Sequence, residues 1–177
     1  MTKNMLTIYD FGFHYEGSSP DNLSALTEAH KNGVENAALY LGFHYFPPKG
    51  ENPERAFNWF KKASAQHGFS AIAANRWLAK CFVDGIGTEI NYWHAYLHNE
   101  VYFTLYNRYW PAPEEERLHP DNYKFLIYKN VAEATSARLS DAEKESAIEA
   151  AQDFCEKFPK KIDQDRIEVP DFLRKKN

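Results

Sequence analysis

"AHKNGVENAALYLGFHY" at residues 29–45, followed by "PERAFNWFKKA" at residues 53–63, is the part of the sequence that decides the fold. From Ala29 to Tyr45 small and apolar residues follow the frame A-x3-G-x3-A-x3-L-G-x2-Y, and the second stretch follows A-x2-W-F-x-K-A. Intervals of three and four residues place these side chains on the same faces of α-helices. Two helices separated by "FPPKGEN" are therefore expected, with the proline- and glycine-rich stretch as their connection.

The first of these frames recurs along the chain. "GFHY" occurs at 12–15 and again at 42–45, and "LAKCF" at 78–82 occupies the same place in a third unit. In the third unit Cys81 replaces the histidine, while the glycine and tyrosine change only to residues of similar size class. A repeat that maintains packing predicts this pattern better than a chemical site used twice. The expected repeat positions are Gly12, Tyr15, Ala29, Gly33, Ala37, Leu41, Gly42, Tyr45, Ala56, Trp59, Ala63, Leu78, Gly85 and Gly87.

Helical periodicity continues through most of the chain, and glycine- and proline-containing stretches divide it into helix-sized segments. Asn52 before Pro53 predicts one helix start, and Ser140 with Glu143 forms a capping-box pattern for another. The segment 159–177 is charged and contains Pro170, so it is expected to be an extended tail. Helices are expected over residues 4–16, 21–32, 35–46, 53–66, 70–83, 91–108, 122–138 and 141–158.

These frames resemble the SEL-1-like repeat, a tetratricopeptide-like module, over residues 4–110 and most strongly over 25–97. The "DGIG" stretch at 84–87 matches the glycine loop of that family. The resemblance implies an all-α fold, a right-handed α-solenoid of stacked antiparallel helix hairpins. It implies one domain over 1–158, made of hairpins at about 4–32, 35–66 and 70–108 with closing helices over 122–158.

On a helical wheel Ala37, Ala38 and Tyr45 fall on the same face as Leu41, whereas Phe43 points the other way. Gly42 lacks a Cβ where the partner helix is expected to cross. Trp59 is expected to fill the wedge between repeats.

The composition excludes several classes of function. The 177 residues carry a net charge of −4 at pH 7, which does not favour nucleic acid or an anionic membrane as partner. Cys81 and Cys155 form no metal-knuckle or disulfide pattern. The amino-terminal stretch lacks the apolar run of a signal peptide, and no apolar stretch is long enough to cross a membrane, so a cytoplasmic protein is expected. Aromatic residues make up 16% of the chain and suit a protein interface.

The sequence gives only weak signals of a metal site or a catalytic site. His14 and His44 occupy equivalent repeat positions without a third ligand, and His94 and His98 have the spacing of two helical metal ligands without the adjacent glutamate of a zinc protease. Cys81 lies on the packing stripe, which indicates a structural thiol. No catalytic residue, metal or cofactor is therefore predicted.

Two segments leave an alternative open. The acidic stretch in "APEEERLHPDN" (112–122) is either a solvated loop or a contact for a basic partner. The aromatic stretch "WHAYLHNEVYFTLYNRYW" (93–110) is either an interactive surface or core for the carboxy-terminal helices.

The resemblance implies a non-catalytic role in protein assembly, in which the concave surface of the first helices binds a segment of another protein. We expect a bacterial cytosolic immunity protein that neutralises a cognate secreted toxin, such as a type VI or other polymorphic effector. A short array, aromatic enrichment with acidic charge and the lack of an export signal favour this hypothesis. The alternative is an adaptor or scaffold in a signalling or envelope-assembly complex. The candidate partner-binding residues are Phe13, His14, Phe43, His44, Arg76, Trp77 and Lys80.

Overall fold

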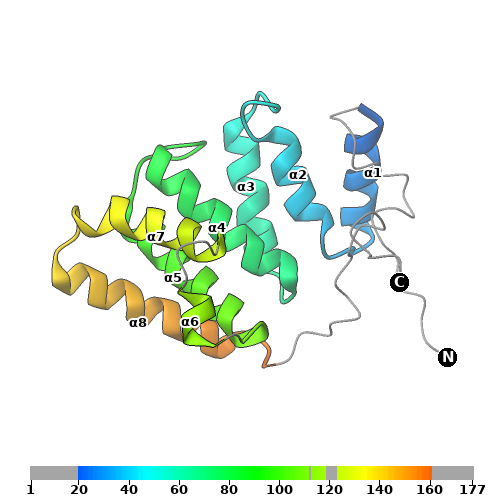
Figure 1. The fold of residues 1–177 in the computed structure, drawn as a ribbon. Helices are drawn as coiled ribbons and strands as arrows, with labels where there is room; N and C mark the ends of the chain where they lie inside the picture. Colours follow the sequence, from blue (N-terminus) through cyan, green and yellow to red (C-terminus); the bar gives the residue numbers. More distant parts are fainter. Residues whose placement is uncertain (1–19, 112, 119–122, 161–177) are drawn as a thin grey trace.

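The computed structural model describes residues 20–111, 113–118 and 123–160, and all regular structure within these ranges is helical (Figure 1). This confirms the predicted all-α class. No helix in these ranges is both long and apolar enough to cross a membrane. The helices are α1 (Pro20–Lys31), α2 (Ala37–Tyr45), α3 (Pro53–Ser64), α4 (Phe69–Asp84), α5 (Tyr92–Tyr109), α6 (Glu114–Arg117), α7 (Tyr123–Ser136) and α8 (Asp141–Lys157).

Some of the predicted features lie outside the described residues. They are the helix expected over 4–16, with Gly12, Phe13, His14 and Tyr15, and almost all of the expected tail. For the other expected helices, both ends lie within about two residues of the prediction. One element was not predicted, because the short helix α6 forms inside the acidic stretch that was expected to be a loop.

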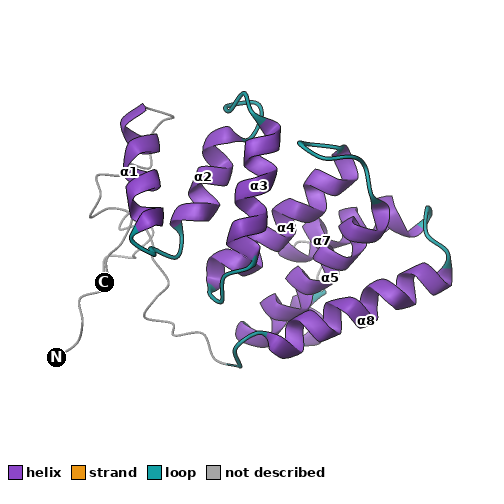
Figure 2. Cartoon of the chain, turned by 180° about the vertical axis from the view of Figure 1, so that it is seen from behind, coloured by secondary structure: helices purple, strands orange, loops and turns teal. Residues whose placement is uncertain are grey.

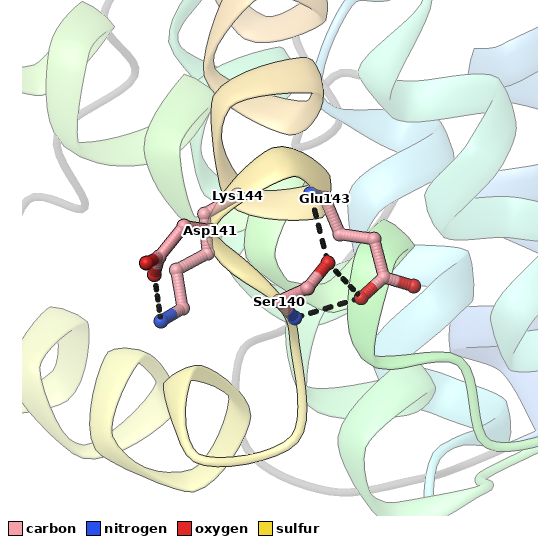
Figure 3. Close-up of polar contacts among 4 residues, drawn as sticks. All are labelled: Ser140, Asp141, Glu143 and Lys144. Carbon is pink, nitrogen blue, oxygen red and sulfur yellow. Dashed lines mark hydrogen bonds and ion pairs between the residues drawn. The ribbon is translucent and has the colours of Figure 1, made fainter.

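The helix starts follow the predicted capping chemistry. The Asn52 side chain accepts a hydrogen bond from the backbone N–H of Arg55 at 3.0 Å, with Pro53 in the first turn of α3. At α8 the Ser140 hydroxyl accepts from the Glu143 N–H at 3.3 Å, and the Ser140 N–H donates to the Glu143 carboxylate at 2.7 Å (Figure 3). Each cap satisfies helix N–H groups that have no partner within the helix, and is worth about 0.5–2 kcal/mol.

The helices from α1 to α5 pack against their neighbours in chain order. Figure 1 shows α1 at one end of the molecule and α8 at the opposite end. Beyond α4 the pattern changes, because α5 contacts both α7 and α8, and α7 also contacts α4. Figure 2 shows α5 between α7 and α8. The carboxy-terminal half is therefore organised around α5.

The aromatic stretch in α5 forms core. Val101, Tyr102 and Leu105 are buried in one apolar cluster with the amino-terminal end of α4 and with α8, which we name the α5–α8 cluster. Further aromatic side chains of α5, Phe103 and Tyr106 among them, pack against this cluster. The structure therefore agrees with the second alternative for residues 93–110, in which this stretch packs as core against the carboxy-terminal helices.

Helix α2 divides its apolar residues between two clusters. Ala37 and Leu41 are buried with residues of α1 in the α1–α2 cluster. Ala38 and Leu39 are buried with residues of α3 and α4 in the α2–α4 cluster, and Tyr45 packs against it. The face predicted to carry Ala37, Ala38, Leu41 and Tyr45 is therefore covered by α1 on one side and by α3 and α4 on the other.

Trp59 on α3 connects these two clusters. Its side chain is partly buried and packs against both the α1–α2 and the α2–α4 cluster. The ring lies edge to face with His30 of α1 at 4.9 Å between centroids, and the Lys62 ammonium lies 4.1 Å from its centroid. Trp59 therefore fills the space between α1 and the helices of the α2–α4 cluster.

At Gly42 a side chain of α3 packs directly against the backbone of α2. A Cβ built at Gly42 would lie 2.4 Å from Cε1 of Phe60, whose side chain is fully buried. Another glycine allows a second close approach at the end of this helix pair. Gly87 has φ of +70°, and a Cβ there would lie 2.0 Å from the carbonyl oxygen of Pro53. The "DGIG" loop thus fits against the start of α3 because residue 87 has no side chain.

Replacing Gly42 with alanine is expected to destabilise the protein, although alanine has the better helix propensity by about 1 kcal/mol. The ring of Phe60 fills the space that the new methyl group needs, and overpacking a core typically costs about 1–3 kcal/mol. Urea unfolding would measure the loss. The double variant Gly42→Ala/Phe60→Leu should show favourable coupling, because leucine leaves the methyl group room. A Gly42→Ala protein more stable than the wild type would contradict this account of the α2–α3 contact.

Candidate functional site

A pocket of about 440 Å³ lies between α4 and α7. Its α4 wall contains Arg76, Trp77 and Lys80, with Asp84 one turn further along the same face. Its α7 wall is largely apolar and consists of Ile127, Asn130, Val131 and Ala134. The volume lies within the range of roughly 300–1,000 Å³ that is typical of ligand pockets.

Three of the predicted partner-binding residues, Arg76, Trp77 and Lys80, meet in this pocket. Phe43 lies behind it, because its ring is edge to face with Trp77 at 5.2 Å and with Phe60 at 5.6 Å between centroids. Phe43 is half-buried against the α2–α4 cluster, so part of its surface is already used by the core. His44 does not line the pocket; its ring packs edge to face against Tyr45 at 5.0 Å. Phe13 and His14 lie outside the described residues.

Trp77 forms a fixed wall of the pocket. Its ring is stacked on Phe60 at 5.9 Å between centroids with an interplanar angle of 17°, and Phe46 meets it edge to face at 5.0 Å. Aromatic pairs in such arrangements contribute about 0.5–1.5 kcal/mol beyond their buried area. The orientation of Trp77 is therefore set by the core behind it.

The charged side chains of the pocket are not equivalent. The Lys80 ammonium pairs with the Asp84 carboxylate at 2.7 Å, and both side chains are about half exposed. The Arg76 guanidinium lies 5.3 Å from the Trp77 ring centroid, as in a cation–π contact. Within the described residues it has no hydrogen bond or ion pair. Because Asp84 already pairs with Lys80, Arg76 is a positive charge in the pocket without a carboxylate partner among the residues that the structure describes.

Helix α7 is held in place against α5 by polar and aromatic contacts. The Tyr128 hydroxyl donates to Glu100 Oε1 at 2.7 Å, and the Asn99 side-chain amide donates to the Tyr128 carbonyl at 3.0 Å. The Tyr128 ring is stacked on Phe103 at 4.1 Å between centroids. Burial raises the pKa of Glu100, and burial beside Glu100 raises the pKa of Tyr128. These contacts set the position of the α7 wall.

The two histidines with metal-ligand spacing instead flank the ring of Phe82. The ring centroids of His94 and His98 lie 5.0 and 5.7 Å from that of Phe82. His98 Nδ1 lies 2.8 Å from Asn75 Oδ1, and the Asn75 amide donates to the Ala71 carbonyl. The amide oxygen can only accept, so the contact requires a proton on His98 Nδ1. Burial, with a smaller effect of His94, lowers the pKa of His98 to about 3. His98 is thus neutral and structural at pH 7.

Both cysteines are buried and free. Burial raises the pKa of the Cys81 thiol to about 12 and that of the Cys155 thiol to about 11. Protonated thiols are poor nucleophiles and poor metal ligands. The part of the chain that the structure describes contains no group of three or more histidine, cysteine, aspartate or glutamate residues placed to hold a metal ion.

The residues of the α7 wall were not predicted from the sequence to belong to a site. Ile127, Val131 and Ala134 recur at helical spacing, and this signal predicts an apolar face without showing what it faces. Only the packing of α7 across α4 and α5 makes that face a pocket wall.

The chain matches no family model, and the comparisons with curated proteins and with solved structures find no significant match either.

The buried His98 is expected to make the protein sensitive to acid. The unfolded chain binds a proton near the ordinary pKa of 6.5, whereas the folded protein does so only near 3. The free energy of unfolding should therefore fall as the pH drops from 6.5 towards 3, by roughly 1.4 kcal/mol per pH unit. Urea unfolding at several pH values should show a smaller fall for His98→Gln. The control His44→Gln should follow the wild type, and parallel curves for all three proteins would contradict the assignment.

The partly buried Glu100 should change the pH dependence of stability in the opposite direction. Its pKa is raised above 4.5 in the folded protein, so its stabilising effect is complete below pH 4.5 and is lost as the pH rises through the folded pKa. Glu100→Gln should therefore gain stability relative to the wild type between pH 4.5 and pH 7. Tyr128→Phe should lose more at pH 7 than at pH 4, because the charged carboxylate loses its donor. Urea unfolding at several pH values would measure these effects. Stability differences between the variants and the wild type that do not change with pH would refute the role assigned to Glu100.

Proposed function

We propose that this chain is a non-catalytic protein-binding protein, most specifically a bacterial cytosolic immunity protein that binds and neutralises a cognate secreted toxin of the type VI or polymorphic class. The observation that carries the proposal is the α4–α7 pocket. Three residues predicted from the repeat to bind a partner, Arg76, Trp77 and Lys80, lie together in it. Arginine and tryptophan are the residue types most enriched where binding energy concentrates at protein interfaces.

The proposed architecture is a right-handed solenoid of helix hairpins, similar to SEL-1-like proteins. The packing of α1 to α5 in chain order supports it, since each repeat of a solenoid contacts only its neighbours. The close contact at Gly42 and the position of Trp59 between two clusters agree with the same design. In such a fold α2 and α4 are the first helices of successive hairpins, and α4 supplies the charged wall of the pocket.

The side chains with the most obvious catalytic potential are used structurally, which supports a binding role. Cys81 lies in the α2–α4 cluster, and Cys155 in the α5–α8 cluster. His98 is held by Asn75.

An adaptor or scaffold role is the second candidate, and one observation favours it. Away from the pocket, α3 carries three cations over aromatic rings: Arg55 over Tyr45, Lys61 over Phe57 and Lys62 over Trp59. None of these three cations has a carboxylate partner within the described residues. Two separate binding surfaces suit a protein that joins two partners.

Co-expression tests the immunity role. If a toxin is encoded by the neighbouring gene, expressing this chain with it should restore growth, and the two proteins should co-purify. Arg76→Glu/Lys80→Glu should abolish the rescue, because it reverses the charge of the pocket wall. The matched variant Lys61→Glu/Lys62→Glu, on α3, should still rescue, and thermal unfolding would verify that both variants fold.

Failure of the wild-type chain to rescue growth or to form a complex would refute the immunity role. The adaptor role predicts instead that a pull-down recovers at least two partners and that the α3 variant loses one of them.

A further inference from the structure

We propose that the α4–α7 pocket binds a partner segment in which an apolar side chain lies beside a carboxylate, the carboxylate being held by Arg76. This inference rests on the proposed protein-binding function and specifies the chemistry of the partner at the same site.

The charge of the pocket selects the carboxylate. Among the lining residues Arg76 and Lys80 are positive and Asp84 is negative, and α7 contributes no charged side chain to the lining. The 2.7 Å pair between Lys80 and Asp84 leaves the Arg76 guanidinium without an acceptor within the described residues. A guanidinium offers five N–H donors in a planar fork that matches a carboxylate in bidentate geometry. The chain as a whole is negative, at −4, so this local excess of positive charge is a property of the pocket.

Trp77 prepares Arg76 for this contact. The cation–π contact of the Arg76 guanidinium with the indole ring, 5.3 Å from its centroid, restricts the rotation of the side chain while leaving N–H groups free to donate. The indole ring is itself fixed by Phe60 and Phe46. A carboxylate therefore meets a donor that has already lost part of its side-chain freedom, which reduces the entropy cost of binding.

The apolar part of the segment is selected by α7. Ile127, Val131 and Ala134 line one wall of the pocket, and Val83 extends the apolar lining on α4. Leu126, next to Ile127, is 46% exposed, so apolar surface continues along α7 beyond the pocket. Apolar surface that extends along a helix suits a peptide segment better than a small molecule, because a segment covers the pocket and its margin together.

A peptide library tests the inference without knowledge of the partner. Random 12-residue peptides displayed on phage would be selected on the immobilised full-length chain. The enriched peptides should carry aspartate or glutamate beside an aliphatic or aromatic residue. The affinity of the best synthetic peptide, measured by fluorescence anisotropy, should fall roughly 10- to 100-fold with Arg76→Gln, the range expected for a lost charge-assisted hydrogen bond.

Matched variants locate the binding. Ala134→Glu places a carboxylate in the pocket next to the cations and should block the peptide, whereas Ala134→Gln, of similar size, should weaken it less. Ala134 is exposed and glutamate favours helix, so both variants are expected to fold. Lys157→Gln, at the far end of α8, removes a positive charge outside the pocket lining and should leave the affinity unchanged.

Enrichment of peptides without a carboxylate, equal affinity for the wild type and Arg76→Gln, or no enrichment at all would overturn the inference. The outcome is separable from that of the growth experiment. Rescue that survives both Arg76→Gln and Ala134→Glu would leave the immunity role standing and refute this site. Pocket-dependent peptide binding without rescue would refute the immunity role and leave the acidic-segment site standing.

Discussion

The close contact between α2 and α3 at Gly42 is the constraint on which much of the structure depends. Because residue 42 has no side chain, the ring of Phe60 occupies the space against the backbone of α2. From there Phe60 supports Trp77, which belongs to the next helix and forms a wall of the pocket. The absence of a side chain at Gly42 therefore affects both the packing of α2 against α3 and, through Phe60 and Trp77, the shape of the candidate binding site. The helix-propensity cost of glycine, about 1 kcal/mol, is offset by this packing.

Partly buried polar pairs set the arrangement of the second half of the molecule. The Asn75–His98 hydrogen bond joins α4 to α5, and the Glu100–Tyr128 hydrogen bond joins α5 to α7. Apolar contacts alone tolerate small rotations between helices, whereas a hydrogen bond of 2.7–2.8 Å fixes which residues face each other. All these groups project from α5 or directly onto it, which explains why this helix is central.

The sequence allowed the helices and their caps to be predicted, because these depend on local chemistry such as the Ser140–Glu143 box and the Asn52 cap. It also allowed Arg76, Trp77 and Lys80 to be grouped, since helical spacing places them on one side of the same helix. The direction of Phe43 and the division of the α2 stripe depend on which helices lie on either side. The α7 wall depends on a contact between segments some 50 residues apart in the chain, which no local spacing records.

The shared position of Trp77, between the core and the pocket, has a consequence for how recognition changes during divergence. A substitution of Trp77 alters the proposed binding surface and the packing behind it together, so it carries a stability cost. The α7 wall contains Asn130 and Ala134, both exposed, whose replacement disturbs little packing. In descendants of this chain that acquire new specificities, substitutions should accumulate on α7 while Trp77 and its aromatic neighbours persist. The pocket therefore combines a conservative wall with a variable one.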